Sequence, residues 1–149
     1  MPHRTPKSIL VIVLAALLAA VLPACSTAPD ASGLHMMPMD ELPAEVQSAP
    51  ASVRTAYQFA AANPDVMEDL PCYCGCGGIG HTSNYDCYVA EVAANGSIRF
   101  DGHALGCSIC VDITTDTMRL LEQGKHVPEI RAYIDDTYGK YGTSNMPQE

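Results

Sequence analysis

The sequence has no tryptophan and only two phenylalanines among its 149 residues. Because large aromatic side chains supply much of the area that a hydrophobic core buries, this scarcity predicts a small core. The sequence also shows no internal repeat and no Rossmann, P-loop or hydrolase signature. We therefore expect no catalytic activity, and we expect the cysteines to supply part of the stability.

Positive charge is scarce as well. Eight lysines and arginines oppose 17 acidic residues, and the net charge is −9. Loss of the first 24 residues would remove Arg4 and Lys7 but no acidic residue, which would bring the net charge to −11. Such an acidic surface disfavours nucleic acid as a partner, and it disfavours electrostatic binding to anionic lipid.

The N-terminal residues have the pattern of an export signal. Basic residues within the first seven positions precede an apolar run over residues 9–22, which is too short to span a bilayer comfortably. The sequence Leu-Pro-Ala-Cys at residues 22–25 resembles the lipobox of bacterial lipoproteins. It predicts a lipoprotein signal peptide over residues 1–24 and acyl chains, palmitate included, on Cys25; a plain signal peptide or signal anchor is the alternative. We therefore expect an extracytoplasmic protein that is lipid-anchored to a bacterial membrane.

Residues 25–51 are predicted to be a flexible tether, because prolines recur among alanine, serine and acidic residues with little apolar periodicity. Four side chains within it suit a soft metal ion: His35, Met36, Met37 and Met39. Thioethers prefer Cu(I), so this group would serve for auxiliary metal capture. The equally weighted alternative is apolar packing of the methionines on the folded domain.

The folded domain is predicted over residues 52–141 and is mainly α-helical. Four segments have the residue pattern of helices: residues 52–63, 65–70, 108–123 and 128–138. Asn95-Gly96 is a strong turn signal, and a strand over residues 97–100 would leave it as part of a short β-hairpin. An irregular cysteine-rich loop completes the domain, and residues 142–149 are predicted to be a disordered tail.

Cysteine, in contrast, is abundant, with seven in the chain. Three alternate in the stretch Pro-Cys-Tyr-Cys-Gly-Cys-Gly-Gly, residues 71–78, and two more form a Cys-Ser-Ile-Cys motif at residues 107–110. Alternating spacing lets a looped backbone direct several sulfurs to one centre, and glycines remove the Cβ bulk that would block such a loop. Clustered thiolates are soft ligands that suit Cu(I) and zinc. The predicted metal ligands are six thiolates, with two histidines as auxiliary ligands: Cys72, Cys74, Cys76, Cys87, Cys107, Cys110, His81 and His103.

Six cysteines remain once Cys25 is assigned to the lipid anchor. The alternative to a metal centre is a set of disulfides, which an even number of cysteines outside the cytosol usually forms. The two cysteines of a Cys-x-Cys pair are poorly placed to bridge each other, so the three in residues 72–76 would need partners among Cys87, Cys107 and Cys110. Metal binding uses the same spacing without that crowding, and we favour it. Six thiolates exceed the four ligands of one zinc ion but fit a Cu(I) cluster or two zinc ions; we favour copper, with zinc as the alternative.

Two other functions would use the same cysteines. Cys107 and Cys110 begin a predicted helix, whose N-terminus would lower the pKa of both thiols, and such a pair can catalyse thiol–disulfide exchange. No β-α-β pattern precedes the pair, so this activity is kept as an alternative. The other alternative is a structural or partner-binding lipoprotein in which disulfides only brace the fold.

The motif at residues 71–76 resembles that of the bacterial PCYCGC-motif lipoproteins. Further likeness in Gly80-His81, in Asp86-Cys87, in Gly124-Lys125 and in residues 106–112 and 129–134 extends the resemblance over residues 52–141. The resemblance implies a location and an association with metal more than an activity. Together with the residue pattern, it leads us to expect a membrane-anchored protein that sequesters a soft metal or exchanges it with a donor or acceptor protein. Copper is the metal that we favour.

Overall fold

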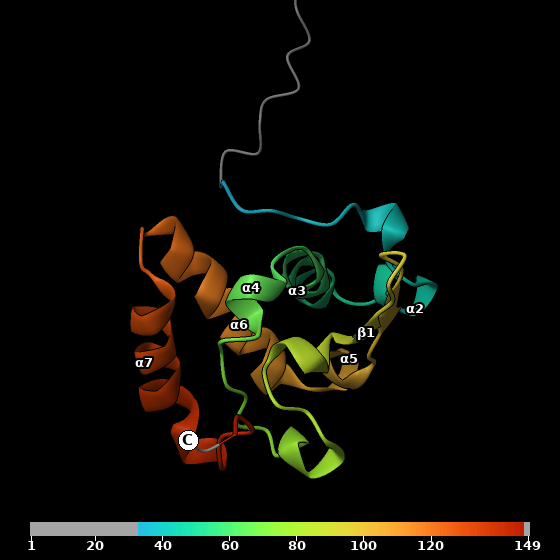
Figure 1. The fold of residues 1–149 in the computed structure, drawn as a ribbon. Coiled ribbons are helices and arrows are strands. Elements are labelled where there is room, and N and C mark those ends of the chain that lie inside the picture. The colour runs from blue at the N-terminus through green and yellow to red at the C-terminus, as the bar shows by residue number, and fades with distance from the viewer. Residues whose placement is uncertain (1–32, 148–149) are drawn as a thin grey trace, which may run out of the picture. The chain divides into compact units, whose positions relative to one another are not determined.

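The computed structural model describes residues 33–147. The predicted signal peptide and the predicted lipid-bearing Cys25 lie outside the described residues and stay predictions. The described chain runs through the following elements (Figure 1): η1 (Met39–Glu41), α2 (Ala44–Gln47), α3 (Ala51–Ala62), α4 (Pro64–Met67), η2 (Cys76–Ile79), η3 (Tyr85–Cys87), β1 (Val89–Val92), β2 (Ile98–Phe100), α5 (His103–Gly106), α6 (Ser108–Glu122), α7 (Val127–Tyr138) and η4 (Gly139–Tyr141).

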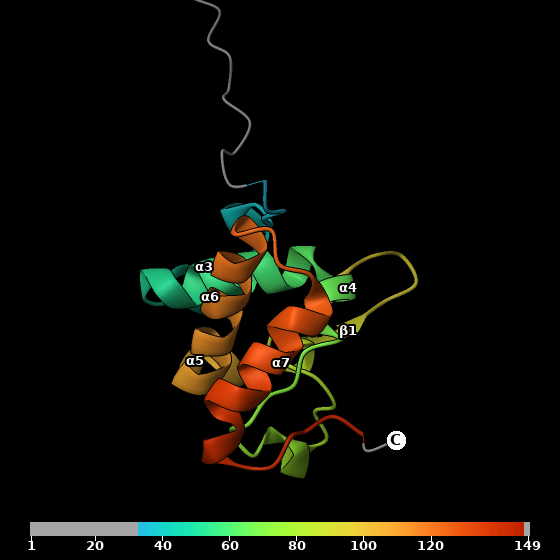
Figure 2. The ribbon, with the colours of Figure 1, turned by 90° about the vertical axis from the view of Figure 1, so that its left-hand side faces the viewer.

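Three helices form the frame of the domain. Helix α6 packs against α3 and also against α7 (Figures 1 and 2). Each helix buries one apolar face, which includes Tyr57 and Phe59 of α3, Ile113 of α6, and Ile130 and Ile134 of α7. The prediction of a mainly α-helical domain is therefore confirmed, and it follows from the apolar periodicity of these three segments.

Local signals in the sequence explain where the helices begin and end. Pro64 cannot donate a backbone hydrogen bond, so α3 ends before it and α4 begins with it. Gly124, with φ of 77°, allows the chain to leave α6, and the next amide donates back to the Leu120 carbonyl (3.0 Å). His126 and Glu129 form a capping box at the start of α7. The predicted helix over residues 65–70 is shorter than expected, since α4 ends at Met67.

The short β-hairpin is present. Strands β1 and β2 pair antiparallel, with Val89 opposite Phe100 and Val92 opposite Ile98, and a bulge interrupts the register after Val89. Gly96, with φ of 83°, occupies the turn that the sequence predicted. The hairpin delivers the chain to α5, and thereby positions His103.

The prediction of a flexible tether is wrong for residues 34–51, which pack on the domain. Leu42 and Val46 are buried in the core. The Met37 amide donates to the Gln58 carbonyl of α3 (2.9 Å), and the Gln58 side chain donates back to the Met37 carbonyl (2.8 Å). Apolar residues spread along a proline-rich segment lack a helical period, but a neighbouring helix can still bury them one at a time.

The prediction of a disordered tail is also wrong for its first residues. The segment after η4 runs beside the cysteine loop, which we define as residues 71–80 (Figures 1 and 2). The Asn145 amide donates to the Cys72 carbonyl (3.1 Å). An asparagine side chain offers both donors and an acceptor, so it can satisfy the unpaired backbone of an irregular loop. Among the helices of residues 33–147, none combines the length and the apolar character needed to cross a membrane.

Candidate metal centre

The cysteine loop turns back on itself at a glycine. Gly75 has φ of 88°, a conformation that glycine adopts without steric cost, and the Gly78 amide closes the turn on the Gly75 carbonyl (3.1 Å). Because of this reversal, neighbouring cysteines of the motif join different clusters. Cys74 joins one group of metal-binding side chains, and Cys72 and Cys76 join another.

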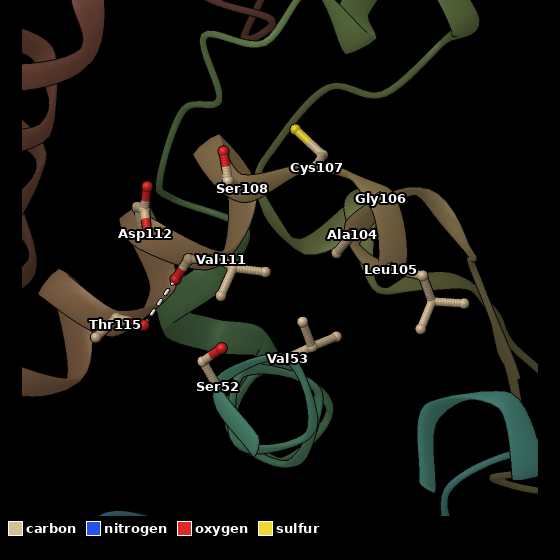
Figure 3. Close-up of a pocket in the computed structure, with 10 residues that line it drawn as sticks. All are labelled: Ser52, Val53, Ala104, Leu105, Gly106, Cys107, Ser108, Val111, Asp112 and Thr115. Carbon is tan, nitrogen blue, oxygen red and sulfur yellow. Dashed lines mark hydrogen bonds between the residues drawn. The ribbon is translucent and has the colours of Figure 1, made fainter. Parts of the chain in front are cut away.

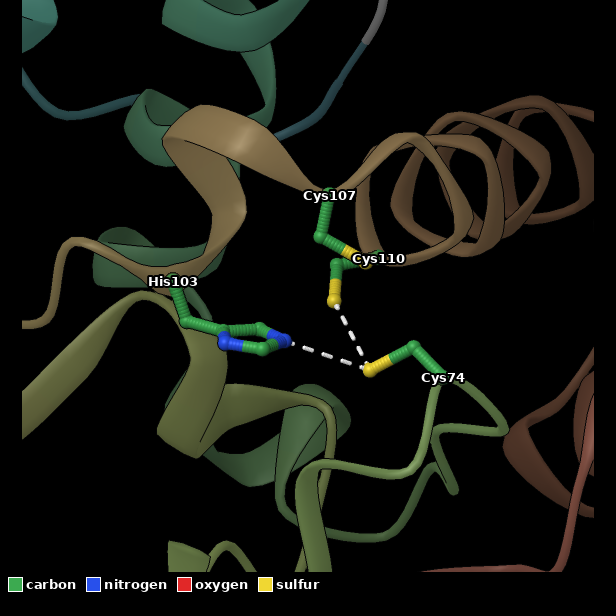
Figure 4. Close-up of side chains that lie close together, drawn as sticks. All are labelled: Cys74, His103, Cys107 and Cys110. Carbon is green, nitrogen blue, oxygen red and sulfur yellow. Dashed lines mark hydrogen bonds between the residues drawn. The ribbon is translucent and has the colours of Figure 1, made fainter.

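Four donor side chains, which we call the outer group, converge from the cysteine loop and the starts of α5 and α6 (Figure 4): Cys74, His103, Cys107 and Cys110. Their ligand atoms all lie within 4.8 Å of one another. Cys74 Sγ lies 3.3 Å from His103 Nε2 and 3.7 Å from Cys110 Sγ. With metal–ligand bonds of about 2.3 Å to sulfur and 2.1 Å to nitrogen, tetrahedral zinc places two sulfurs about 3.8 Å apart and a sulfur and a nitrogen about 3.6 Å apart. The outer group therefore has the spacing of a Cys3His metal site.

Hydrogen bonds to the backbone fix the outer group. The Asp101 carboxylate accepts from the His103 amide (2.7 Å), and the Asp101 carbonyl accepts from the hydroxyl of Tyr57 (2.7 Å). The hydroxyl of Tyr88 donates to the Cys110 carbonyl (2.8 Å) at the start of α6. Two buried tyrosines thus hydrogen-bond to the backbone at or near His103 and Cys110. Hydrogen bonds of this kind commonly orient the ligands of metal sites.

Three buried thiols form a second cluster, which we call the inner group: Cys72, Cys76 and Cys87. Their sulfurs also lie within 4.8 Å of one another, and Cys87 Sγ is 3.7 Å from Cys76 Sγ. All three residues are at most 2% exposed, whereas Cys74, His103 and Cys107 of the outer group are half-buried. The inner group is therefore shielded from water, and the outer group has an accessible edge.

The two groups adjoin. Cys72 Sγ lies 3.4 Å from Cys74 Sγ and 3.5 Å from Cys110 Sγ, so an inner thiol contacts two outer thiols. His81 belongs to neither group, but its Nδ1 lies 3.5 Å from Cys87 Sγ, and its ring packs edge-on against that of His103 at a centroid distance of 5.3 Å. The structure thus brings all eight predicted ligands into one contiguous cluster.

The thiols change one another's acidity. Hydrogen bonds with Cys72 and, second, with Cys87 lower the pKa of Cys110 to about 6. Cys110 raises the pKa of Cys72 through the same contact, but hydrogen bonds with Cys76 and Cys87 outweigh this effect and lower it overall. Burial raises the pKa of Cys74. The pKa of Cys110 is therefore lowered, and hydrogen bonds with neighbouring thiols are the largest causes.

All six cysteines within residues 33–147 are free thiols. The sulfur–sulfur contacts of 3.4 to 3.7 Å are far longer than the bond of about 2.05 Å in a disulfide. The spacing instead matches that of ligands around a shared metal ion. The described residues therefore give the disulfide alternative no support.

The predicted auxiliary residues lie apart from these clusters. Met36, Met37 and Met39 pack against the hydrophobic core, which is the alternative that the sequence left open. His35 is exposed and belongs to neither donor group, and the Asn63 side chain holds its carbonyl (2.8 Å). A role of these four residues in metal capture stays a prediction.

No local pattern in the sequence predicted the contacts of Asn145 with the cysteine loop. Its side-chain oxygen accepts from the Cys72 amide (2.7 Å), and its Nδ2 donates to the Ser83 carbonyl (2.9 Å) and lies 3.5 Å from Cys76 Sγ. Asp101 was missed as well, although an aspartate two residues before a candidate histidine ligand is a local signal. Both residues support ligands without being ligands themselves.

A pocket of about 420 Å³ lies beside the outer group, between the start of α3 and the α5–α6 segment (Figure 3). Val53, Leu105 and Val111 give it apolar walls, and Asp112 lies at its rim. Cys107 lines the pocket, but its sulfur points away from the other lining side chains (Figure 3). The pocket therefore borders the outer group, and Cys107 belongs to both.

In a comparison with protein families, residues 14–148 match the model described as protein of unknown function with PCYCGC motif. The match extends beyond residues 52–141 at both ends, so it includes the segments that pack before α3 and after α7. Comparisons with curated proteins and with solved structures give no match.

Proposed function

The chain belongs to the family of proteins with the PCYCGC motif, and we propose that it binds a soft metal ion through its clustered thiolates. Copper(I) is the ion that we favour. The observation that carries the proposal is the convergence of six free thiols and His103 into two adjoining donor groups. Separate segments supply these side chains, and buried tyrosines and the tail hold them in place. Such support is typical of metal ligands.

Copper(I) is favoured over zinc by the inner group. Structural zinc sites are almost always four-coordinate, and the inner group offers three thiolates shielded from water. Copper(I) is the softer ion, so it is better matched to an all-sulfur donor set. The outer group supports zinc as the alternative, because its three sulfurs and one imidazole fit a tetrahedral site.

The proposed role is sequestration of the metal or its exchange with a donor or acceptor protein, without catalysis. The half-buried edge formed by Cys74, His103 and Cys107 supports exchange, since a partner's ligand must reach the metal before the last bond to this protein breaks. The accompanying proposal for location is a lipid anchor on Cys25 at an extracytoplasmic membrane face, which rests on the sequence of residues 1–25.

Thiol–disulfide exchange at Cys107 and Cys110 is a second candidate, which the lowered pKa of Cys110 favours. Against it, the low-pKa thiol is the buried one, where a substrate disulfide has no access. A Cys110→Ala variant separates the two functions. An exchange enzyme would accumulate a mixed disulfide at Cys107, whereas a metal-binding protein would lose bound metal.

Elemental analysis combined with thiol titration tests the proposal. The full chain, purified reduced in detergent without chelator, should carry copper, and the six thiols of residues 33–147 should react with a thiol reagent only after the metal is stripped. Zinc in place of copper would select the alternative ion. A metal-free protein whose thiols react at once, or whose mass shows three disulfides, would overturn the proposal.

A further inference from the structure

We propose that the centre holds two metal ions in unequal, adjoining sites: an outer site that accepts zinc or copper(I), and an inner site that accepts copper(I) alone. The inference rests on the proposed function and deepens it, since it assigns a substrate class to each donor group. Three features of the structure carry it: the number of ligands in each group, their burial, and the position of Cys72.

The first feature is the number of ligands. The outer group has four donor atoms within 4.8 Å of one another, which completes a tetrahedron around one ion. The inner group has three, and His81, the nearest further donor, is close to Cys87 but does not join the group. Its imidazole is also engaged on the other side, where Nε2 lies 3.6 Å from Asp101 Oδ2. The inner group therefore lacks the fourth protein ligand that zinc prefers, while three thiolates suffice for copper(I).

The second feature is burial. A zinc ion with three protein ligands takes water as its fourth, as catalytic zinc sites do. Cys72 and Cys87 have no exposed surface, and Cys76 is 2% exposed. The side chain of Asn145 covers Cys76, with its Nδ2 3.5 Å from Cys76 Sγ. Water is thus a poor fourth ligand here, and the inner site selects against zinc. The outer site keeps an accessible edge at Cys74 and Cys107, so the metal held there is the one that exchanges with a partner.

The third feature is Cys72, whose sulfur is 3.4 Å from that of Cys74 and 3.5 Å from that of Cys110. Both distances are those of sulfurs in direct contact. Cys72 therefore places the inner site directly against the outer one, while the outer ion keeps its own four ligands.

Titration of the reduced, metal-free full chain with each ion tests the inference without any variant. Native mass spectrometry should show one zinc ion per chain with zinc alone and two copper ions with copper(I) alone. Addition of one equivalent of copper(I) to the zinc form should give a mixed species with one ion of each kind. Equal numbers of zinc and copper ions, or release of zinc in step with that first equivalent of copper, would overturn the inference.

Variants then assign the sites. Cys87→Ser, or Cys76→Ser if the first variant fails to fold, should keep one zinc ion and lower the copper(I) capacity from two to one. Cys107→Ser should abolish tight zinc binding and leave one copper(I). Ser108→Ala, next to Cys107 but in neither donor group, is the matched control and should bind as the unaltered chain does.

Failure of the inference differs from failure of the proposed function. A chain that binds neither ion contradicts the proposed function itself. A chain that binds one ion of either kind, and loses it in both the Cys87→Ser and the Cys107→Ser variants, has a single shared centre. That result would overturn the two-site inference and leave soft-metal binding intact.

Discussion

Replacement of Asn145 by alanine tests whether the C-terminal segment is part of the metal centre. The side chain accepts a hydrogen bond from the Cys72 amide (2.7 Å) and donates one to the Ser83 carbonyl (2.9 Å), and both partners belong to buried residues. A neutral hydrogen bond contributes about 1 kcal/mol, and a buried donor left without an acceptor costs about 1–3 kcal/mol. Since Asn145 is half-buried, water can replace part of this loss. We expect the free energy of unfolding to fall by about 2 kcal/mol.

Chemical denaturation of the reduced, metal-free protein, followed by circular dichroism, measures this change. For a domain of this size a loss of about 2 kcal/mol corresponds to a melting temperature lower by roughly 8 °C. Thr143→Ala is the matched control, because Thr143 is exposed in the same segment and should change stability by less than about 0.5 kcal/mol. If Asn145→Ala were as mild as this control, the docking of the tail on the cysteine loop would be refuted.

Three further changes probe the loop and its ligands. In Gly142→Ala the new Cβ would lie 2.8 Å from the Tyr73 carbonyl oxygen, so the tail must shift, and thermal unfolding should show a loss of about 1–3 kcal/mol. Asp101→Ala removes the acceptor of the His103 amide, and competition with a chromophoric chelator should show zinc affinity about 10- to 100-fold weaker. In the metal-free protein, thiolate absorbance should rise as the pH increases through about 6, because Cys110 is protonated below its lowered pKa and ionised above it.

Each of these predictions has a control and a contradictory outcome. Gly78→Ala places its Cβ where no other atom lies within 4 Å, and it should be milder than Gly142→Ala; the reverse order would contradict the close approach at Tyr73. Asp65→Ala, at an exposed position, should leave zinc affinity unchanged, and an equal effect of both aspartate variants would contradict the role of Asp101. Cys110→Ser should remove the absorbance step near pH 6; its persistence would assign the low-pKa thiol elsewhere.

The helices and the hairpin could be predicted because their signals are local. Proline, glycine and the apolar period mark α3, α6 and α7 to within about two residues, and Asn95-Gly96 marks the turn between β1 and β2. The packing of Leu42 and Val46, and that of the tail, could not be predicted in this way. Those contacts depend on surfaces that exist only after the helices have assembled.

For the candidate metal centre, too, local sequence features predicted one part and tertiary packing decided the other. The motif and the spacing of six cysteines and two histidines were enough to predict the family and the side chains that converge, because residue types and their order are local features. The preference for a soft metal follows from thiolate chemistry and stays a proposal. The assignment of Cys74 to one group and Cys76 to the other was decided only by the turn at Gly75 and by the placement of α6. Cys72 meets Cys110 across 38 positions and Asn145 across 73. Contacts over such separations arise from tertiary packing, which no local pattern in the chain records.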